Sequence, residues 1–308
     1  MAFAPLNALS AFIAVARRRS FAAAARDLGV STSALSQSVR QLEERVGLAL
    51  LTRTSRSVAL TEAGQRLLES AGPGVDSAFD ALKTVGAKPG EVTGRIRLSV
   101  PGAAVSLVLT RVVPTFVKRH PGVELDICVE NRFVDIVAEG LDAGIRLVEA
   151  IDRDMVHVRL SDEARLVVVA APSYLARKGA PKRPEDLVQH DCLCFRLRAE
   201  GEPYAWELER GKKTWRHAVH GSVTTNDREL LRALAVAGLG LMYTLEPLVA
   251  GELQRGQLRV VLEPYAPIVP GLFLYFPSRA QVSPALRAFL TVAREIAGTG
   301  RKSARGRA

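Results

Sequence analysis

The chain has 308 residues, of which 48% are hydrophobic and 24% charged. This composition excludes a disordered or low-complexity protein, and the length allows two or three domains with real cores. The formal net charge of +10 favours an anionic partner such as nucleic acid, although charge alone does not define a fold. Residues 1–60 hold eight Lys and Arg against three Asp and Glu, a net of +5, so the excess is concentrated at the start.

No segment reads as an export or membrane signal. In MAFAPLNALSAFIAVARRRS, residues 1–20, the basic side chains follow the apolar run instead of preceding it, which favours an amphipathic helix over a signal peptide. No apolar run reaches the roughly 18 residues that a membrane span needs. The three cysteines cannot make an even disulfide framework. We therefore expect a cytoplasmic protein with no membrane partner.

Residues 20–46 predict two short helices joined by a glycine turn. Ser20 and Ser31 are suited to cap the two helix starts, and Gly29 suits the tight turn between them. The second helix has an apolar stripe at spacings of four, three and four, formed by Leu35, Val39, Leu42 and Val46. A polar sector of roughly 140° lies well away from that stripe. Its members are Thr32, Ser33, Ser36, Gln37 and Arg40.

Two helices joined by a glycine turn form the helix-turn-helix arrangement, in which the second helix enters the major groove. Short hydroxyl and amide groups suit base edges and phosphates. The alternative is a helical hairpin with a solvated polar face. The next stretch, LTRTSRSVAL at 51–60, carries two arginines and no acid, and predicts a small β-wing along phosphates. The predicted DNA contacts are Ser31, Thr32, Ser33, Ser36, Gln37, Arg40, Arg53, Thr54 and Arg56.

The stretch ALSAFIAVARRRSFAAAARDLGVSTSALSQSVRQLEERVGLALLTRTSRSVALTEAG, residues 8–64, resembles the LysR-type transcriptional regulators. That family typically shows Ser-Phe-x-x-Ala-Ala, Leu-Glu-x-x-Leu-Gly and Leu-Thr-x-x-Gly in this order. Leu51 stands where a Phe is usual, and because both are apolar anchors the difference concerns local packing alone. The resemblance is specific over these residues and looser beyond them. It implies a homo-oligomeric transcription factor that binds double-stranded DNA and a small molecule.

Residues 61–90 predict a linker helix that pairs with a partner helix. Apolar residues recur there in steps of three and four, an a/d heptad seam. Pro73, between two glycines, predicts a kink or a shorter helix, and GAKPG at 86–90 predicts a hinge. The alternative is an amphipathic helix packed on its own chain. The predicted dimerisation residues, a role that the family resemblance also implies, are Leu68, Ala71, Val75, Ala78, Leu82 and Val85.

After residue 91 strand and helix patterns alternate, which predicts α/β units with mostly parallel sheets. The expected strands are 95–100, 124–129, 165–170 and 271–276, and the expected helices are 103–119, 133–139, 227–237 and 284–297. The fold class is therefore α/β overall. By resemblance, this part is a Rossmann-like, two-lobed, periplasmic-binding-protein-like effector domain. The chain would then cross between its lobes near Ser161 and Pro264–Pro267.

These inferences give a domain plan. The plan is a winged helix-turn-helix domain at 1–60, a linker at 61–90, an effector-binding domain at 91–300 with lobe I at 91–160 and 266–300 and lobe II at 161–265, and a basic, disordered tail at 301–308.

Ligands in open α/β sheets collect beyond the carboxyl ends of strands, near helix N-termini. LSVPGAAVS and SVTTNDRELLRAL both run into predicted helices through small polar residues, and together they would suit a carboxylate. The alternative is that these hydroxyls only cap their helices. Arg146 would bind an acidic ligand or form a structural ion pair. The predicted effector site is Ser99, Pro101, Gly102, Glu130, Asn131, Arg146, Phe195, Arg196, Thr225, Asn226 and Tyr243.

Other constellations do not assemble into chemistry. His190, Cys192 and Cys194 lack a second ligand pair at zinc spacing, and His217 and His220 fall in a predicted strand that would point them to opposite faces. No nucleophile motif or phosphate loop is present. We expect no cofactor, no metal and no enzymatic activity. The rival functions are a solute-binding module without specific DNA recognition and an enzyme using the interlobe cleft. The resemblance further suggests a dimer of dimers and contact with RNA polymerase.

Overall fold

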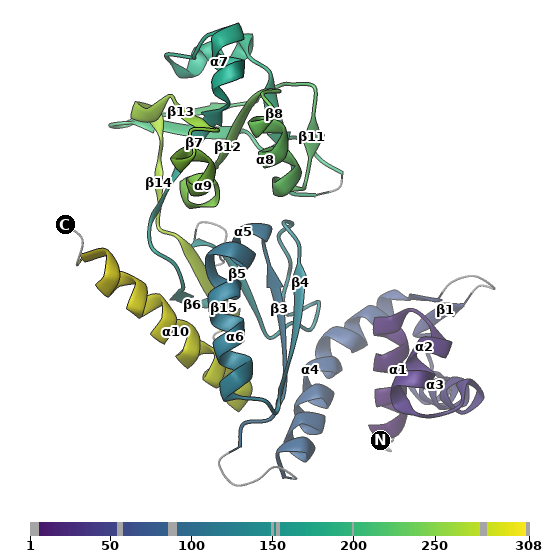
Figure 1. Ribbon diagram of the computed structural model, residues 1–308. Helices are drawn as coiled ribbons and strands as arrows, with labels where there is room; N and C mark the ends of the chain where they lie inside the picture. The colour runs from purple at the N-terminus through teal and green to yellow at the C-terminus, as the bar shows by residue number, and fades with distance from the viewer. Residues whose placement is uncertain are drawn as a thin grey trace. The chain divides into compact units, whose positions relative to one another are not determined.

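The computed structural model describes residues 6–53, 58–85, 91–148, 151, 155–198, 200–277 and 282–305 (Figure 1). Side chains are described for these residues except 53, 73, 77, 80–85 and 299–305. The chain divides into two compact units. The first reaches Gly94 and also takes in Val137–Gly140, and the second holds the remaining residues from Arg95 on. Each unit has its own core, and each is described by itself.

The first unit is helical, with one small hairpin. Its elements are α1 (Leu6–Arg18), α2 (Phe21–Leu28), α3 (Thr32–Val46), β1 (Leu51–Arg53), β2 (Val58–Leu60) and α4 (Glu62–Val85). The strands pair antiparallel, with Leu51 opposite Leu60, as the predicted wing requires. Phe12 of α1, Val39 and Leu42 of α3, and Leu50 are buried together in one core. The core therefore fixes which face of α3 stays accessible.

The predicted caps of α2 and α3 are present. The Ser20 hydroxyl accepts a hydrogen bond of 3.3 Å from the Ala23 amide, and the Ser31 hydroxyl accepts one of 3.2 Å from the Ala34 amide. Gly29 ends α2 with φ of 65°, in the left-handed region that glycine adopts without a steric penalty. These contacts satisfy donors that a helix start leaves unpaired.

The linker helix differs from its prediction. α4 continues unbroken through Pro73 to Val85, so the helix is not shortened there. Arg17 of α1 donates two hydrogen bonds, of 2.8 and 2.6 Å, to the carboxylate of Asp76 and ties the middle of α4 to the helix cluster. We attribute the continuity of the helix to this packing, which outweighs the local cost of a proline and its glycines. The predicted hinge at 86–90 lies outside the described residues.

The second unit contains two lobes, each built on one sheet (Figure 1). The first lobe has five strands in the order β4-β3-β5-β15-β6. These strands are β3 (Gly94–Val100), β4 (Val123–Val129), β5 (Ala143–Leu147), β6 (Met155–Arg159) and β15 (Leu272–Pro277). A continuous helical run of α5 (Gly102–Ala104), a π-helical turn (Val105–Leu109) and α6 (Thr110–Arg119) packs beside α10 (Pro284–Arg305). Phe116 of α6 meets Phe289 of α10 edge to face.

The second lobe has the strand order β11-β8-β12-β7-β13, with β14 also paired to β7. Its strands are β7 (Ala164–Ala170), β8 (Cys192–Phe195), β11 (Thr224–Thr225), β12 (Leu241–Leu245), β13 (Arg259–Val261) and β14 (Ile268–Val269). Val167 and Val169 face a core with α8 (Arg228–Val236), whereas Val168 and Ala170 face the other core. Helices α7 (Pro172–Lys178) and α9 (Ala250–Gln254) and the hairpin β9 (Trp206–Arg210) and β10 (Lys213–His217) complete the lobe.

Three expectations about local structure are wrong. The sheets are mixed, because β15 pairs antiparallel with both β5 and β6, and β7 pairs antiparallel with β12, β13 and β14. Residues 133–135 are irregular and 136–139 form a turn instead of a helix; alternate residues Val134 and Ile136 are buried, a period that a helix does not provide. α10 extends to Arg305, so the start of the predicted disordered tail is helical, as its Ala, Arg and Lys content allows. Residues 306–308 lie outside the described residues.

The chain passes between the two lobes at two neighbouring connections. It leaves the first sheet after β6 and enters the second at β7, so Ser161 lies in the first connection, as expected. The return falls between β14 and β15, at Pro270 and Gly271, a few residues beyond the predicted Pro264–Pro267. The shift arises because β14 still pairs with β7 of the second sheet. The two connections are bonded to each other: the Leu272 amide donates to the Ser161 hydroxyl over 2.8 Å.

Candidate DNA interface and effector site

The polar face of α3 is accessible in the first unit. Thr32, Ser33, Gln37 and Arg40 are exposed and Ser36 is half-buried, while Leu35, Val39 and Leu42 are buried on the opposite side. Val46 is the exception among the predicted core residues, with 44% of its surface exposed. It lies in the last turn before Gly47, beyond the reach of the core. The helix therefore has one packed face and one face of short polar groups and a guanidinium.

One side chain, that of Glu43, holds the segment that leads from α3 into the wing. The Glu43 carboxylate accepts hydrogen bonds from the Leu50 and Leu51 amides over 2.9 and 3.0 Å. Leu51, which stands in place of the family's usual Phe, is buried in the core. At Gly64 an added Cβ would lie 2.0 Å from the Leu50 carbonyl oxygen, so only glycine fits. These contacts give a physical reason for a Glu and a Gly in the motifs that resemble the family.

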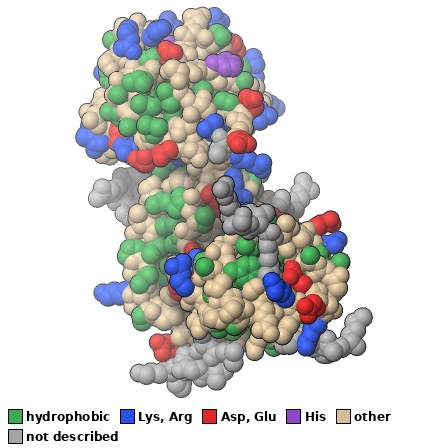
Figure 2. Space-filling model, turned by 90° about the vertical axis from the view of Figure 1, so that its right-hand side faces the viewer, with side chains coloured by type: hydrophobic (Ala, Val, Ile, Leu, Met, Phe, Trp, Pro, Cys, Tyr) green, Lys and Arg blue, Asp and Glu red, His purple; other side chains and the backbone are tan. Residues whose placement is uncertain are grey.

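The predicted wing contacts fall outside the described side chains. Thr54 and Arg56 lie outside the described residues, and Arg53 belongs to β1 with its side chain undescribed. On the face drawn in Figure 2, the coloured Lys and Arg side chains are interspersed with Asp and Glu. Positive charge is therefore not gathered there into one broad patch.

The predicted dimerisation seam on α4 has two parts. Val75 is buried in the core of its own unit, and Leu68 packs against that core, so these two positions follow the alternative of a helix packed on its own chain. Ala71 is half-buried and Ala78 exposed, while the side chains of Leu82 and Val85 lie outside the described residues. The sequence prediction missed Phe79, which is 47% exposed in the second half of α4.

Two adjoining cavities lie beside the strand ends of the second unit. The first measures about 790 Å³ and is lined by residues of both lobes and of the β9–β10 hairpin. The second measures about 950 Å³ and shares five lining residues with the first, namely Ala103, Asn131, Phe133, Leu197 and Arg228. Of the predicted effector residues, those that line a cavity are Pro101, Gly102, Glu130, Asn131, Arg146, Phe195, Asn226 and Tyr243.

The other predicted effector residues lie outside both linings. Ser99 is 0% exposed and cannot touch a ligand in this arrangement. The Arg196 amide donates to the Thr225 carbonyl over 3.0 Å, which pairs β8 with β11. The Thr225 hydroxyl accepts from the Asp227 amide over 3.1 Å at the entry to α8. The helix itself is capped by Asp227, whose Oδ1 accepts from the Leu230 amide over 3.0 Å.

Arg146 has mainly a structural role. Its guanidinium donates to the Ser99 carbonyl and hydroxyl over 3.2 and 2.9 Å, to the Ile145 carbonyl over 2.7 Å and to the Arg132 carbonyl over 2.8 Å. The Ser99 hydroxyl in turn donates to Glu130 over 3.2 Å. Burial lowers the pKa of Arg146. The side chain thus ties β3, β5 and the segment after β4 together, and few of its donors remain for a ligand.

The sequence prediction missed Arg228, at the first turn of α8. It lines both cavities, and its guanidinium carbon lies 4.0 Å from the centre of the Phe195 ring. Its Nε is buried and has no hydrogen-bond partner among the described residues, while the side chain as a whole is half-buried. Burial lowers its pKa to about 10, so the side chain is still charged at neutral pH. Arg228 therefore keeps a donor that can turn to a ligand in the cavity.

Asn131 joins the two lobes through one amide. Its Oδ1 accepts from the Gly102 amide at the start of α5 over 3.1 Å, and its Nδ2 donates to the Asn226 carbonyl over 3.0 Å. This link lies in the lining shared by the two cavities.

The cysteines and histidines give no sign of a metal or redox site. Cys192 and Cys194 are free and buried, and burial raises the pKa of Cys192 to about 12, which disfavours a reactive thiolate. His190 contacts the Tyr174 hydroxyl over 3.1 Å. Among the residues that the structure describes, no group of three or more His, Cys, Asp and Glu is placed to hold a metal ion. None of the described helices is long and apolar enough to cross a membrane.

A winged helix-turn-helix unit followed by a two-lobed ligand-binding unit defines a ligand-responsive DNA-binding regulator. Residues 6–65 match the family model for the bacterial regulatory helix-turn-helix protein, lysR family. Residues 89–298 match the model for the LysR substrate binding domain. The chain therefore belongs to the LysR family of transcriptional regulators, which confirms the sequence prediction. It is a DNA-binding transcription regulator with an effector-binding domain, and it is not an enzyme.

Relatives and solved structures agree with this assignment. A transcriptional regulator of Pseudomonas aeruginosa is 39% identical over 281 residues, which is 91% of this chain and 92% of the relative. The HTH-type transcriptional regulator PgrR of Escherichia coli K12 is 35% identical over 285 residues, 92% of this chain and 93% of PgrR. CrgA, a LysR-type regulator from Neisseria meningitidis, has a TM-score of 0.57 and 26% identity, covering 94% of this chain and 98% of CrgA. The full-length Vibrio cholerae virulence activator AphB shares the fold, with a TM-score of 0.63, 20% identity, and coverage of 94% and 98%.

Proposed function

We propose that the polar face of α3 reads an operator sequence in the major groove and that the wing contacts phosphates. The observation that carries this proposal is the exposure of Thr32, Ser33, Gln37 and Arg40 opposite a fully packed face. Arg40 is long enough to reach a guanine edge or a phosphate, and the shorter groups suit bases and backbone near the helix start. The proposed wing contacts are Arg53, Thr54 and Arg56.

The reading helix is proposed to act in pairs. The second half of α4, with Ala78 and Phe79 exposed, offers apolar surface to a second copy of the chain. Two reading helices related by a two-fold axis require a nearly palindromic operator. We extend the proposal to a dimer of dimers that acts in the cytoplasm and changes DNA bending or contact with RNA polymerase.

Gel retardation with DNA from upstream of the gene, at several salt concentrations, tests the reading face. We expect specific retention that persists at moderate salt, and about a tenfold or larger loss for Arg40→Ala, since a good base contact is worth roughly 1–3 kcal/mol. Arg45→Ala is the matched control, because Arg45 is also exposed on α3 but lies about 140° around the helix. Equal losses for both variants would reduce Arg40 to a general charge effect. Binding no stronger than to random DNA would favour the rival of a solute-binding module.

The effector is proposed to be a small anionic molecule held between the lobes. The observation that carries this proposal is Arg228, a half-buried cation whose Nε has no hydrogen-bond partner among the described residues, at a cavity reached by both lobes. A carboxylate would satisfy its guanidinium in a bidentate, charge-assisted contact. Asn131 and Asn226, which lie in the same lining, would add neutral polar contacts.

Binding regulates only if the ligand prefers one arrangement of the lobes. The Asn131 link to the Asn226 carbonyl is a contact that such a preference could strengthen or break. A thermal-shift screen of metabolites tests the proposal, because a ligand that favours the folded state raises the melting temperature. We expect acids to stabilise the protein and Arg228→Ala to abolish that shift. Stabilisation that survives in Arg228→Ala would place the anion elsewhere.

A further inference from the structure

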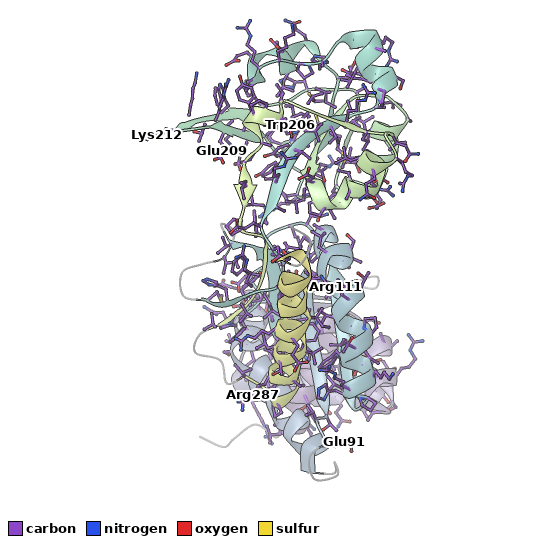
Figure 3. The ribbon with its side chains drawn as sticks, turned by 60° about the vertical axis from the view of Figure 1, so that its left-hand side comes forward. Glu91, Arg111, Trp206, Glu209, Lys212 and Arg287 are labelled. Carbon is purple, nitrogen blue, oxygen red and sulfur yellow. The ribbon has the colours of Figure 1, made fainter. Side chains whose placement is uncertain are left out.

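The helix α10, which packs on the first lobe, has a basic outer face. α10 lies on the near side of that lobe in Figure 3, where Arg287 is labelled. Arg287 and Arg294 are exposed, and so are Thr291 and Gly298 between and beyond them. At about 100° per residue these four positions fall within a sector of roughly 60°, and the buried Phe289 lies on the opposite side of the helix. These four residues form the α10 basic face.

The two packed helices hold almost no acid that could neutralise this face. α6 contains three Lys and Arg and no Asp or Glu, and Glu295 is the one acid of α10. Glu295 is already paired, since its Oε2 lies 2.5 Å from Nη1 of Arg119 on α6. The positive charge of Arg287 and Arg294 is therefore not offset by a free carboxylate of either helix.

The sequence extends the same face toward the C-terminus. The helix continues to Arg305, and Arg301 and Arg305 occupy positions seven and eleven residues after Arg294, in register with the face. Their side chains lie outside those described, so the inference rests on the described arginines. Residues 299–308 add four Lys and Arg and no acid. From Arg287 to Arg305 the helix rises about 27 Å, the length of about eight base pairs of a duplex.

Double-stranded DNA is the anionic partner that fits this face best. A duplex carries one negative charge per about 1.7 Å, and each phosphate that a Lys or Arg neutralises releases counterions. Contacts of this kind carry no sequence information. The first unit belongs to a DNA-binding family, so a second contact of the same chain with the same duplex forms at a raised effective concentration. An acidic protein lacks that advantage.

We propose that the α10 basic face binds the phosphate backbone of DNA that flanks the operator. This contact is independent of base sequence and is made by the ligand-binding unit of the same chain. The inference rests on the proposed function, in which α3 reads the operator. It adds a second DNA surface, so that the protein engages a longer stretch of DNA than the stretch that it reads.

Gel retardation of the full-length protein with two duplexes tests this contact. The short duplex ends at the operator that footprinting defines, and the long duplex adds about two helical turns of arbitrary sequence on each side. We expect the wild type to bind the long duplex at least about tenfold more tightly at low salt. Arg287→Ala combined with Arg294→Ala should remove this gain and leave binding of the short duplex unchanged. On the long duplex, the slope of log affinity against log salt should fall by about two for each α10 in contact.

Two further double variants make the test specific. Lys178→Ala combined with Arg259→Ala is the matched control, because both residues are exposed on the second lobe and the pair removes the same charge. This control should bind both duplexes as the wild type does. Arg287→Lys combined with Arg294→Lys keeps the charge and should retain most of the gain, since an ammonium group also binds phosphate. All these variants should melt at the wild-type temperature, because the substitutions lie on the surface.

The outcomes separate this inference from the proposed function. Specific retention of the short duplex with no gain from the flanks overturns the α10 contact and leaves the reading helix standing, and so does a gain that survives the double alanine variant. Equal losses in that variant and in the Lys178 and Arg259 control would reduce the effect to net charge and overturn the contact as well. Retention of both duplexes no stronger than that of random DNA overturns the proposed function, and this inference with it.

Discussion

Replacing Glu43 should loosen the segment that connects the reading helix to the wing. Its carboxylate accepts from two successive amides, Leu50 and Leu51, over 2.9 and 3.0 Å. Hydrogen bonds to charged groups contribute roughly 1.5–3 kcal/mol each, and because Glu43 is only half-buried, water can replace part of this. We therefore expect Glu43→Ala to destabilise this segment by about 2–3 kcal/mol. Glu43→Gln, which keeps an acceptor oxygen, should cost about 1 kcal/mol.

Hydrogen exchange of the peptide 48–53 in the full-length protein measures this effect. A loss of about 2 kcal/mol corresponds to about 30-fold faster exchange of the two amides. Glu44→Ala is the control, because Glu44 is exposed on the same helix. In this variant the peptide 48–53 should exchange at the wild-type rate. Specific DNA binding should fall in parallel with the loss of protection. If Glu43→Ala exchanged no faster than Glu44→Ala, the two bonds would not hold the segment.

Two further changes test other contacts. Gly64→Ala places a Cβ 2.0 Å from a backbone carbonyl oxygen and should lower the free energy of unfolding by more than about 3 kcal/mol. Gly74→Ala, whose Cβ would have nothing within 4 Å, should instead stabilise α4 by up to about 1 kcal/mol. Thermal unfolding that ranks the two variants in the opposite order would refute this geometry. Arg165 donates to both oxygens of Glu246 over 2.9 and 2.7 Å and holds the pKa of that carboxyl below its usual 4.5. A depressed folded-state pKa stabilises the protein fully above pH 4.5, and this stability is lost as the pH falls through that pKa, so Glu246→Gln should flatten the acid limb of the stability curve. Superimposable acid limbs would contradict this role.

The sequence predicted the helix-turn-helix unit well because its signals are local. Caps at Ser20 and Ser31, a glycine turn and a 3.6-residue period each act within a few residues. The prediction that Val46 is buried was wrong, because the period of an apolar stripe does not show at which residue the core ends. Val75 is buried in the core of its own unit and Leu68 packs against that core, because a heptad seam fits a partner chain and the chain's own core equally well.

The effector site was harder to predict because it depends on packing between distant segments. Arg146 stood out at a strand end, yet it bonds to carbonyls of β3 and of the segment after β4. Arg228 looked like an ordinary first-turn residue of a capped helix. Only the fold brings it over Phe195 and leaves it without an acid among the described residues. The prediction of mostly parallel sheets was wrong for the same reason. β7 and β15 pair antiparallel with their neighbours, and their direction follows from the connections between the lobes.

The two connections between the lobes have a consequence for how such regulators diversify. The Leu160 amide donates to the Leu272 carbonyl over 2.8 Å, so the points at which the chain departs and returns are adjacent. The second lobe is thus an insertion whose ends already meet, and β15 and α10 complete the first lobe after it (Figure 1). A short graft joining residues 160 and 272 would excise Arg228 together with the whole second sheet. Exchanging that one cassette would replace the second lobe's share of the cavity lining and keep the first lobe's share, with Asn131 and Arg146, in place.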